Sequence, residues 1–340
     1  MTPTTPSRIK ADPGNFHGVD SAGPRRRRAW RSAAVILVTL LMFGGLPAQQ
    51  AARDQDQDYT TGRITVRVDK VNILCTVVDN KGRFVTDLTK NDFIVYDEGK
   101  PQIIEEFDAR SEIPLAISLL IDTSASVSKK LKFEQEAASE FFYTILRKED
   151  KALLVEFDTG VTLIQDFTHD PNLLDKQLKT LRAAGGTSMY DALYLVSEEK
   201  LIWDQGEQRK TVIIISDGED TVSSVTFEDA LEMIHRSGAI IFAISTNKGG
   251  HFGVRGNDEG DAILEQLASA TGGRVYYPTR LEDLGLAFKE IERELRSQYS
   301  ISYIPKELKQ DGKFHPIRVN VKGGNLTVRH RKGYVAMRRD

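Results

Sequence analysis

An acidic residue and two serines follow a long apolar segment of the chain. Residues 115–121 read LAISLLI, and Asp122, Ser124 and Ser126 then form the pattern D-x-S-x-S. In an extended loop alternate side chains point the same way, so these oxygen-bearing groups can converge on one point. Oxygen ligands without His or Cys suit a hard divalent cation, with Mg²⁺ as the first choice. An ordinary polar loop can carry the same short pattern, so the rest of the chain has to decide between the two interpretations.

Two later segments also place oxygen-bearing side chains after apolar strands or before helices. Asp217 follows the apolar run 211–216, and the loop 184–188 (AGGTS) precedes an expected helix over 189–199, where it would present Thr187 or Ser188. Ligands of open α/β sheets bind at the carboxyl ends of the strands, so all three segments are expected at one edge. The alternative is that the hydroxyls cap helices, with Ser126 or Ser128 capping a helix near residue 129, while Asp217 only starts a turn.

The segments that carry these residues predict the fold class. Residues 115–121, 152–157, 211–216 and 239–245 are nearly all apolar, as strands buried on both faces must be. Amphipathic helical patterns lie between them, and the last runs over 281–297. The alternation predicts an α/β domain with a doubly wound, mostly parallel sheet and helices on both faces, with a short hairpin partner at 161–164 on one edge.

Alternating polar and apolar residues flank this domain on both sides. Residues 63–110 and 298–340 each predict only a few strands, and a sheet needs at least three strands with one covered face. We therefore expect the two β segments to pair in a small all-β, sandwich-like module, with the α/β domain (111–297) inserted in it.

The amino-terminal region has the composition of an export segment. Residues 25–28 are four arginines, and an apolar run over 33–46 follows. No clear cleavage site follows, so residues 1–48 are interpreted as a basic tail with either a signal peptide or a retained membrane anchor. Residues 49–62 are polar and are expected to form a flexible linker. The protein is therefore predicted to be exported to the periplasm, the cell envelope or the medium, with membrane tethering as an option.

Composition and motifs argue against several other classes. The net charge is −3 with both signs interspersed, which gives no electrostatic footprint for nucleic acid. Cys75 is the only cysteine, so the chain has no internal disulfide, and the residue is expected to be a small buried hydrophobe. The six histidines are scattered without ligand spacing for zinc, and the phosphate-binding loop, G-x-S-x-G and H-E-x-x-H motifs are absent.

Taken together, the three motifs resemble a known family. D-x-S-x-S at 122–126, G-G-T-S at 185–188 and S-D-G at 216–218 are similar to the metal-ion-dependent adhesion site (MIDAS) of von Willebrand factor type A (VWA) domains, over roughly 113–296. The flanking residues 92–99 and 331–334 resemble the bacterial VWFA-related (Acidobacteria-type) proteins of that family.

The resemblance implies a non-enzymatic, adhesion-type binding function. It implies metal contacts from the hydroxyls of Ser124, Ser126 and Thr187, with Asp122 and Asp217 holding the ion directly or through water. Mg²⁺ is the expected metal, with Mn²⁺ or Ca²⁺ as alternatives. Only two carboxylates face the ion, so it keeps an open position for a Glu or Asp carboxylate of a protein partner.

Two other functions stay open. A Mg²⁺-dependent phosphotransferase of the haloacid dehalogenase type would use Asp122 as nucleophile, but that family normally has a second Asp two residues on as the general acid, where this chain has Ser124. A structural envelope protein with a vestigial metal site is the other alternative. The Gly-rich loop 247–260 leaves the predicted strand 239–245 at the same edge, and it is interpreted either as a partner contact or as a tolerated insertion.

Overall fold

The computed structural model describes residues 7–9, 70–109, 113–204, 208–247, 258–280, 283–307 and 309–336. Apart from residues 7–9, which form a short strand, the predicted basic tail and signal segment lie outside these ranges, and so do the linker, residues 63–69 of the first β segment and residues 248–257 of the Gly-rich loop. Within them, no helix combines the length and the apolar character that crossing a bilayer requires.

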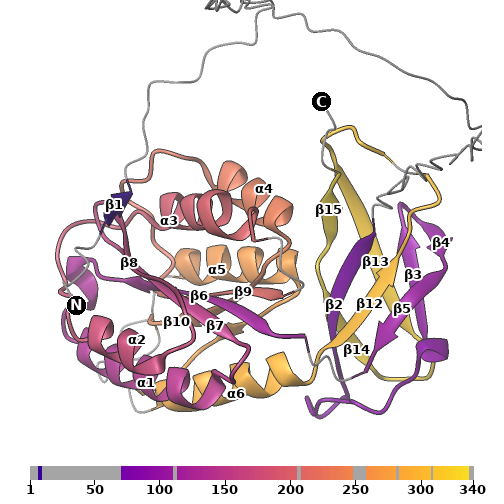
Figure 1. Ribbon diagram of the computed structural model, residues 1–340, viewed down its shortest axis with the longest axis horizontal. Helices are drawn as coiled ribbons and strands as arrows, with labels where there is room; N and C mark the ends of the chain where they lie inside the picture. Colours follow the sequence, from indigo (N-terminus) through magenta and orange to yellow (C-terminus); the bar gives the residue numbers. More distant parts are fainter. Residues whose placement is uncertain are drawn as a thin grey trace, which may run out of the picture. The chain divides into compact units, whose positions relative to one another are not determined.

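A seven-stranded sheet forms the centre of the α/β domain (Figure 1). The central strand β6 (Leu115–Asp122) is buried at every position, as its apolar sequence predicts. It lies between β7 and β9 and runs parallel to both, and β10 and β11 continue in the same direction on one side. On the other side β8 pairs antiparallel with β7, and β1 pairs antiparallel with β8. The remaining strands are β1 (Ser7–Ile9), β7 (Lys151–Phe157), β8 (Val161–Thr168), β9 (Arg209–Ser216), β10 (Ile240–Ser245) and β11 (Val275–Tyr276).

Helices cover both faces of this sheet (Figure 1). One apolar cluster joins Leu119 of β6 to the helices α1, α2 and α6, and a second joins Leu120, which points the opposite way, to α3, α4 and α5. The predicted doubly wound fold is therefore confirmed. The helices are α1 (Leu131–Ile145), α2 (Pro171–Leu178), α3 (Met189–Val196), α4 (Phe227–Ser237), α5 (Asp258–Thr271) and α6 (Leu284–Arg296).

Two antiparallel sheets of four strands make up the β module, in the orders β14-β2-β12-β5 and β15-β13-β3-β4. Strands from both sides of the α/β region pair with each other: β2 pairs with β12, and β3 pairs with β13. The two sheets enclose an apolar core that contains Ile73, Tyr299 and Cys75. Cys75 is 1% exposed, as expected for a small buried hydrophobe, and burial raises the pKa of its thiol. The strands are β2 (Val71–Val78), β3 (Phe93–Asp97), β4 (Lys100–Gln102), β5 (Ile104–Asp108), β12 (Tyr299–Tyr303), β13 (Phe314–Val321), β14 (Thr327–His330) and β15 (Gly333–Val335).

Glu294 of α6 joins the α/β domain to the β module. Its carboxylate is fully buried and lies 2.6 Å from Arg329 Nη2 of β14 and 2.9 Å from Arg274 Nε. The hydroxyl of Tyr276 also donates a hydrogen bond to the same carboxylate at 3.2 Å. A buried carboxylate with two guanidinium partners is costly to leave unpaired, so this cluster should hold α6 against β14.

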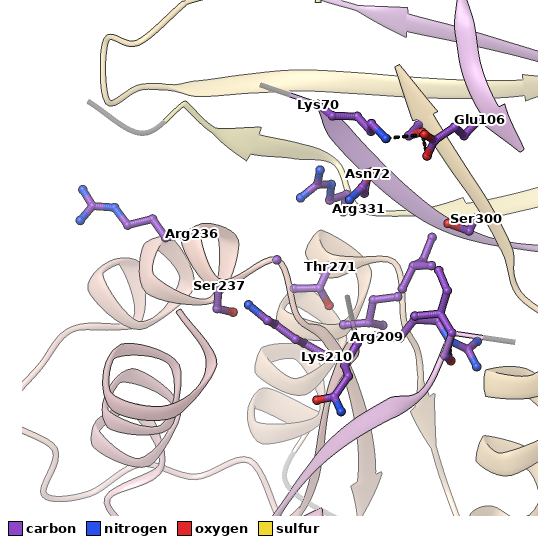
Figure 2. A pocket seen from close by; sticks show the side chains of 16 residues that line it. Lys70, Asn72, Glu106, Arg209, Lys210, Arg236, Ser237, Thr271, Ser300 and Arg331 are labelled. Carbon is purple, nitrogen blue, oxygen red and sulfur yellow. Dashed lines mark hydrogen bonds and ion pairs between the residues drawn. The ribbon is translucent and has the colours of Figure 1, made fainter. Parts of the chain in front are cut away.

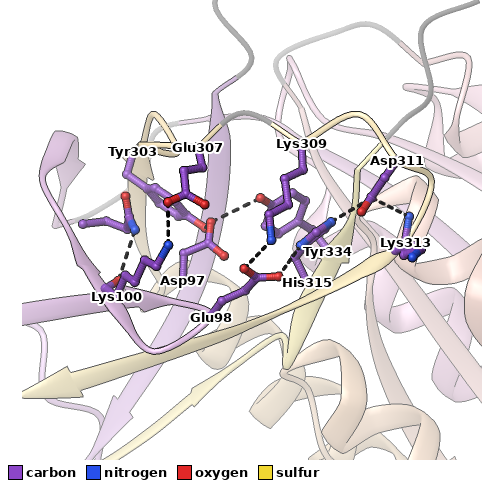
Figure 3. Close-up of polar contacts among 11 residues, drawn as sticks. Asp97, Glu98, Lys100, Tyr303, Glu307, Lys309, Asp311, Lys313, His315 and Tyr334 are labelled. Carbon is purple, nitrogen blue, oxygen red and sulfur yellow. Dashed lines mark hydrogen bonds and ion pairs between the residues drawn. The ribbon is translucent and has the colours of Figure 1, made fainter.

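A second polar cluster lies within the β module (Figure 3). His315 Nδ1 is 2.8 Å from Glu98 Oε1, and His315 Nε2 is 3.0 Å from Asp311 Oδ1. Burial lowers the pKa of this imidazole, but the hydrogen bonds to Asp311 and Glu98 outweigh it, so its pKa is raised. The hydroxyls of Tyr303 and Tyr334 both donate to the buried Asp97 carboxylate. These contacts tie the turn between β3 and β4 to the loop that precedes β13.

Several element boundaries differ from the sequence-based expectation. β8 extends to Thr168 instead of residue 164, and its later positions are only half-buried, so they lack the apolar signal that marks a central strand. The α3 helix ends at Val196 and continues as a π-helix over Ser197–Leu201. The last helix begins at Leu284 and ends at Arg296, inside the predicted 281–297.

Candidate metal site

Asp122 ends β6 and is completely buried. The backbone N–H of Ser124 donates to its Oδ1 at 2.8 Å, and the Ser216 hydroxyl at the end of β9 donates to its Oδ2 at 3.0 Å. Burial raises the pKa of Asp122 to about 6; the hydrogen bonds from Ser124 and Ser216 oppose this shift, and the negative charge of Asp217 adds to it. Ionisation of Asp122 is therefore unfavourable in the folded protein, and a cation bound beside the carboxylate would stabilise its charged form.

The hydroxyls of Ser124 and Ser126 lie on the same side of the loop after β6. Their Oγ atoms are 2.8 Å apart, and Ser126 Oγ donates to Asp217 Oδ2 at 3.4 Å. Neither serine caps α1: Lys130 is its N-cap residue, and Ser124, at the start of the short 3₁₀ helix Ala125–Val127, makes no side-chain capping bond. The structure thus brings together Asp122, Ser124, Ser126 and Asp217 from two strand ends.

The loop that carries Thr187 lies beside the D-x-S-x-S loop. The Ala125 N–H donates to the Gly185 carbonyl at 3.2 Å, and the Ala184 N–H donates to the Thr123 carbonyl at 2.7 Å. Gly185 has φ +75°, and a Cβ there would lie 2.3 Å from Thr159 Oγ1, so the close approach requires glycine. Thr187 is 5% exposed, and no described residue hydrogen-bonds to its hydroxyl, which leaves that oxygen available as a ligand.

The loop after β9 fixes Asp217. The Glu219 N–H donates to Asp217 Oδ1 at 3.1 Å, which forms a turn, while Oδ2 accepts the Ser126 hydroxyl. Asp217 therefore starts a turn and also faces the serines, so the two interpretations of this residue are compatible. Behind the turn, Gly218 has φ +79° and packs so closely on Gly260 that a Cβ would lie 2.2 Å from its carbonyl oxygen.

Two supporting residues in this region have roles that the sequence did not predict. Ser216 appeared only as the first letter of S-D-G, yet its hydroxyl orients Asp122. Asp220, three residues after Asp217, is half-buried and accepts hydrogen bonds from the Tyr190 N–H at 3.0 Å and the Ser223 hydroxyl at 2.6 Å. Asp220 therefore holds the start of α3, which follows the Thr187 loop.

Glu134 of α1 is a third buried carboxyl group near the site. It is 0% exposed, and neither of its oxygens has a hydrogen-bond partner among the described residues. Burial raises its pKa to about 8, with a further contribution from the charge of Asp122. A signal was present in the sequence: Glu134 lies three residues after Leu131 and four before Ala138, on the apolar face of the helix.

The donor set fits a hard cation better than zinc. Across the described ranges no three His, Cys, Asp or Glu side chains gather into a group that could hold a metal ion. The candidate site instead offers two carboxylates and neutral hydroxyls, which are ligands that Mg²⁺, Mn²⁺ and Ca²⁺ accept.

Comparison with known proteins places the α/β domain in a family. The family model for the von Willebrand factor type A domain matches residues 117–219. Among curated proteins, the chain is 29% identical over 182 residues to calcium-activated chloride channel regulator 3A-1 of Mus musculus, a match that covers 52% of this chain and 19% of that protein. The chain therefore spans about a fifth of the length of this relative.

Solved structures with a similar fold include bacterial and animal proteins. The vWF domain of the type V pili tip protein Mfa5 from Porphyromonas gingivalis is 14% identical, with a TM-score of 0.45, and the match covers 54% of this chain and 96% of that one. Proximal thread matrix protein 1 from the mussel byssus, with a zinc-occupied MIDAS motif, is 19% identical with a TM-score of 0.43, over 54% of this chain and 48% of that one. The match to residues 117–219 identifies this part of the chain, which lies within the doubly wound α/β domain, as a von Willebrand factor type A domain.

Proposed function

We propose that the chain is an exported, metal-dependent protein-binding module of the adhesion type, and not an enzyme. Asp122, Ser124, Ser126, Thr187 and Asp217 would hold a divalent cation, Mg²⁺ in the first place. The observation that carries this proposal is the hydrogen-bonded convergence of Ser124, Ser126 and Asp217 above the buried Asp122.

The charges of this set explain why it would recognise an acidic partner. Two carboxylates balance the charge of a divalent cation, and the three hydroxyls add ligands without adding charge. The bound cation would supply an electrophilic coordination position, which a Glu or Asp carboxylate of a partner could fill. Ser126 is exposed, so a partner could approach the cation from the side of this residue. Asp122 is buried and would contact the cation from the protein interior.

The proposed location follows from the amino-terminal sequence. The arginine cluster 25–28 and the apolar run 33–46 support export, either with a cleaved signal or with a retained anchor. The described module would then act in the periplasm, the envelope or the medium.

Metal binding is the first test of the proposal. Thermal unfolding of the full chain would be measured without metal and with Mg²⁺, Mn²⁺ or Ca²⁺. We expect a metal-dependent rise in the unfolding temperature that Asp122→Ala abolishes and that Ser128→Ala, a change at an exposed serine two residues beyond the motif, retains. An equal rise in all three proteins would exclude this site.

Partner chemistry needs a separate measurement. An array of peptides in Glu/Gln and Asp/Asn pairs would be probed with the chain in Mg²⁺ and in EDTA. Binding to acidic members only, lost in EDTA and in Asp122→Ala, is the expected result. Binding that is indifferent to the acid-to-amide change would reject the proposed recognition of a carboxylate. Phosphatase turnover that is lost in Asp122→Asn would instead favour the phosphotransferase alternative.

A further inference from the structure

A cavity among the described residues lies at the end of the α/β sheet opposite the candidate metal site. It has a volume of about 430 Å³ and is bordered by the start of β9, the end of α4 and the outer face of β2 and β12 (Figure 2). Lys210 lies near the beginning of β9, whereas Asp217 follows the end of that strand, so the two sites are separated by the length of β9.

Cationic side chains dominate the lining. Five of the lining residues are Lys or Arg, and Glu106 is the only acid. Lys70 already pairs with Glu106 at 2.5 Å, and Arg236 pairs with Glu232 at 2.5 Å. Figure 2 shows Lys210 and Arg331 extending toward the cavity from opposite domains. Neither forms an ion pair with a carboxylate of the described residues, and the charge of Asp204 acts on Lys210 only from a longer distance.

Polar atoms without partners gather around the same cavity. Arg331 Nε, Gln208 Oε1 and Arg209 Nη2 are buried and make no hydrogen bond to any described residue. Arg209 is 3% exposed, and its Nε and Nη1 donate to the carbonyl oxygens of Ile113 and Leu295, which carry no net charge. Buried polar atoms normally have a partner, so this group of unpaired atoms indicates a ligand or ordered water.

Neutral polar side chains complete the opposite wall. In β2 and β12 alternate residues face the module core, as Ile73 and Ile301 do, so their neighbours Asn72 and Ser300 point outward toward the cavity. An amide and a hydroxyl can bind the uncharged polar part of a ligand, while the cations bind its charged end.

We propose that this cavity binds a small oxyanion attached to a polar, sugar-sized body. The negative group would lie between Lys210 and Arg331, and the hydroxyls of the body would face Asn72 and Ser300. A phosphate ester and a carboxylate present the same oxyanion chemistry here, and the volume exceeds what a bare inorganic anion fills.

Titration calorimetry of the full chain in metal-free, low-salt buffer tests this proposal. The probes are glucose 6-phosphate, glucuronate, inorganic phosphate and, as the neutral control, glucose. We expect binding of at least one sugar anion and none of glucose, with an affinity that falls as salt is added. Tighter glucose 6-phosphate would identify a phosphate site, and tighter glucuronate a carboxylate site; both support the proposal.

Substitutions locate the binding. Lys210→Met and Arg331→Met should each weaken binding of the preferred probe by roughly tenfold or more, because each removes a charged hydrogen-bond donor. Lys148→Met, at a side chain that is 95% exposed, should leave binding unchanged, and so should Asp122→Ala, which separates this site from the proposed metal site. No binding of any anion, which would mean that the cavity holds water only, or binding that survives both cavity substitutions would overturn the proposal.

Discussion

Replacing Asp122 by Asn should stabilise the metal-free protein and abolish its stabilisation by metal. The side chain is completely buried, and the negative charge of Asp217 already disfavours its ionisation. Asn keeps the shape of the side chain, can accept the hydrogen bond from the Ser124 N–H and carries no charge. The metal-free variant should therefore be more stable than the wild type at neutral pH, although it has lost a candidate ligand.

The size of this effect follows from the pKa of Asp122. This pKa rises from its ordinary value of 3.8 to about 6, and at about 1.36 kcal/mol per pH unit the difference is on the order of 3 kcal/mol. Because the folded-state pKa is raised, the folded protein binds the proton more tightly, and stability falls as pH rises between these two values. The advantage of Asp122→Asn should thus be absent below pH 3.8 and complete above pH 6.

Chemical denaturation with and without Mg²⁺ measures both halves of this prediction. A ligand that binds only the folded state, present at a concentration of a hundred times its Kd, adds about 2.7 kcal/mol to the free energy of unfolding. Metal should therefore bring the stability of the wild type close to that of the variant, whose stability should not change with metal. Asp158→Asn is the matched control: it lies just after β7, and an amide retains its hydrogen bond from the Gly160 N–H. A variant that is less stable than the wild type in EDTA at pH 7, or one that gains as much from Mg²⁺, would refute the reasoning.

Three further substitutions test other buried charges. Glu294→Gln should lower the free energy of unfolding, measured with denaturant, by about 3 kcal/mol, because two guanidinium groups lose their buried counter-charge. The control Glu290→Gln, at a half-exposed side chain, should lower it by well under 1 kcal/mol. Equal losses would contradict the link from α6 to β14. His315→Gln should destabilise the protein most at mildly acidic pH. The pKa of His315 is raised in the folded state, so its contribution to stability is complete below the unfolded-state pKa and is lost as pH rises through the folded-state pKa. A loss of stability that grows with pH would contradict this assignment. Glu134→Met should raise the free energy of unfolding at pH 7 by about 2 kcal/mol or more. The gain should be smaller near pH 4, where the carboxyl group is protonated in both the folded and the unfolded state. A loss of stability at pH 7 would show that the carboxyl group has a partner.

The parts of the fold that were predictable have strong local signals. β6 and β9 are recognisable because a strand covered on both faces must be apolar throughout. Once those strands are parallel, Asp122 and Asp217 necessarily fall at the same edge of the sheet. Their proximity is therefore a consequence of topology, whereas their metal-binding role and the Acidobacteria-type assignment remain predictions.

The parts that were missed depend on tertiary contacts. The second half of β8 is half-buried at the edge of the sheet, so its composition does not separate strand from loop. Glu134 has the helical spacing of a core position, but its side chain is acidic, so sequence alone does not predict that it is buried. Its burial depends on the tertiary packing around α1. The cationic cavity joins Lys210 to Arg331, two residues more than a hundred positions apart in sequence, and no local pattern connects them.

The two proposed sites have opposite charge and lie at opposite ends of one strand. The eight residues of β9 at about 3.3 Å each span roughly 25 Å, well beyond the Debye length of about 8 Å at physiological ionic strength. Direct electrostatic coupling between a cation beside Asp217 and an anion beside Lys210 should therefore be weak. Coupling would instead need a packed element that contacts both regions. Helix α6 packs on α1, which follows the D-x-S-x-S loop, through the stacked rings of Phe141 and Phe288, and it contacts β14 through Glu294. Any communication between the two ends is thus expected to pass through α6.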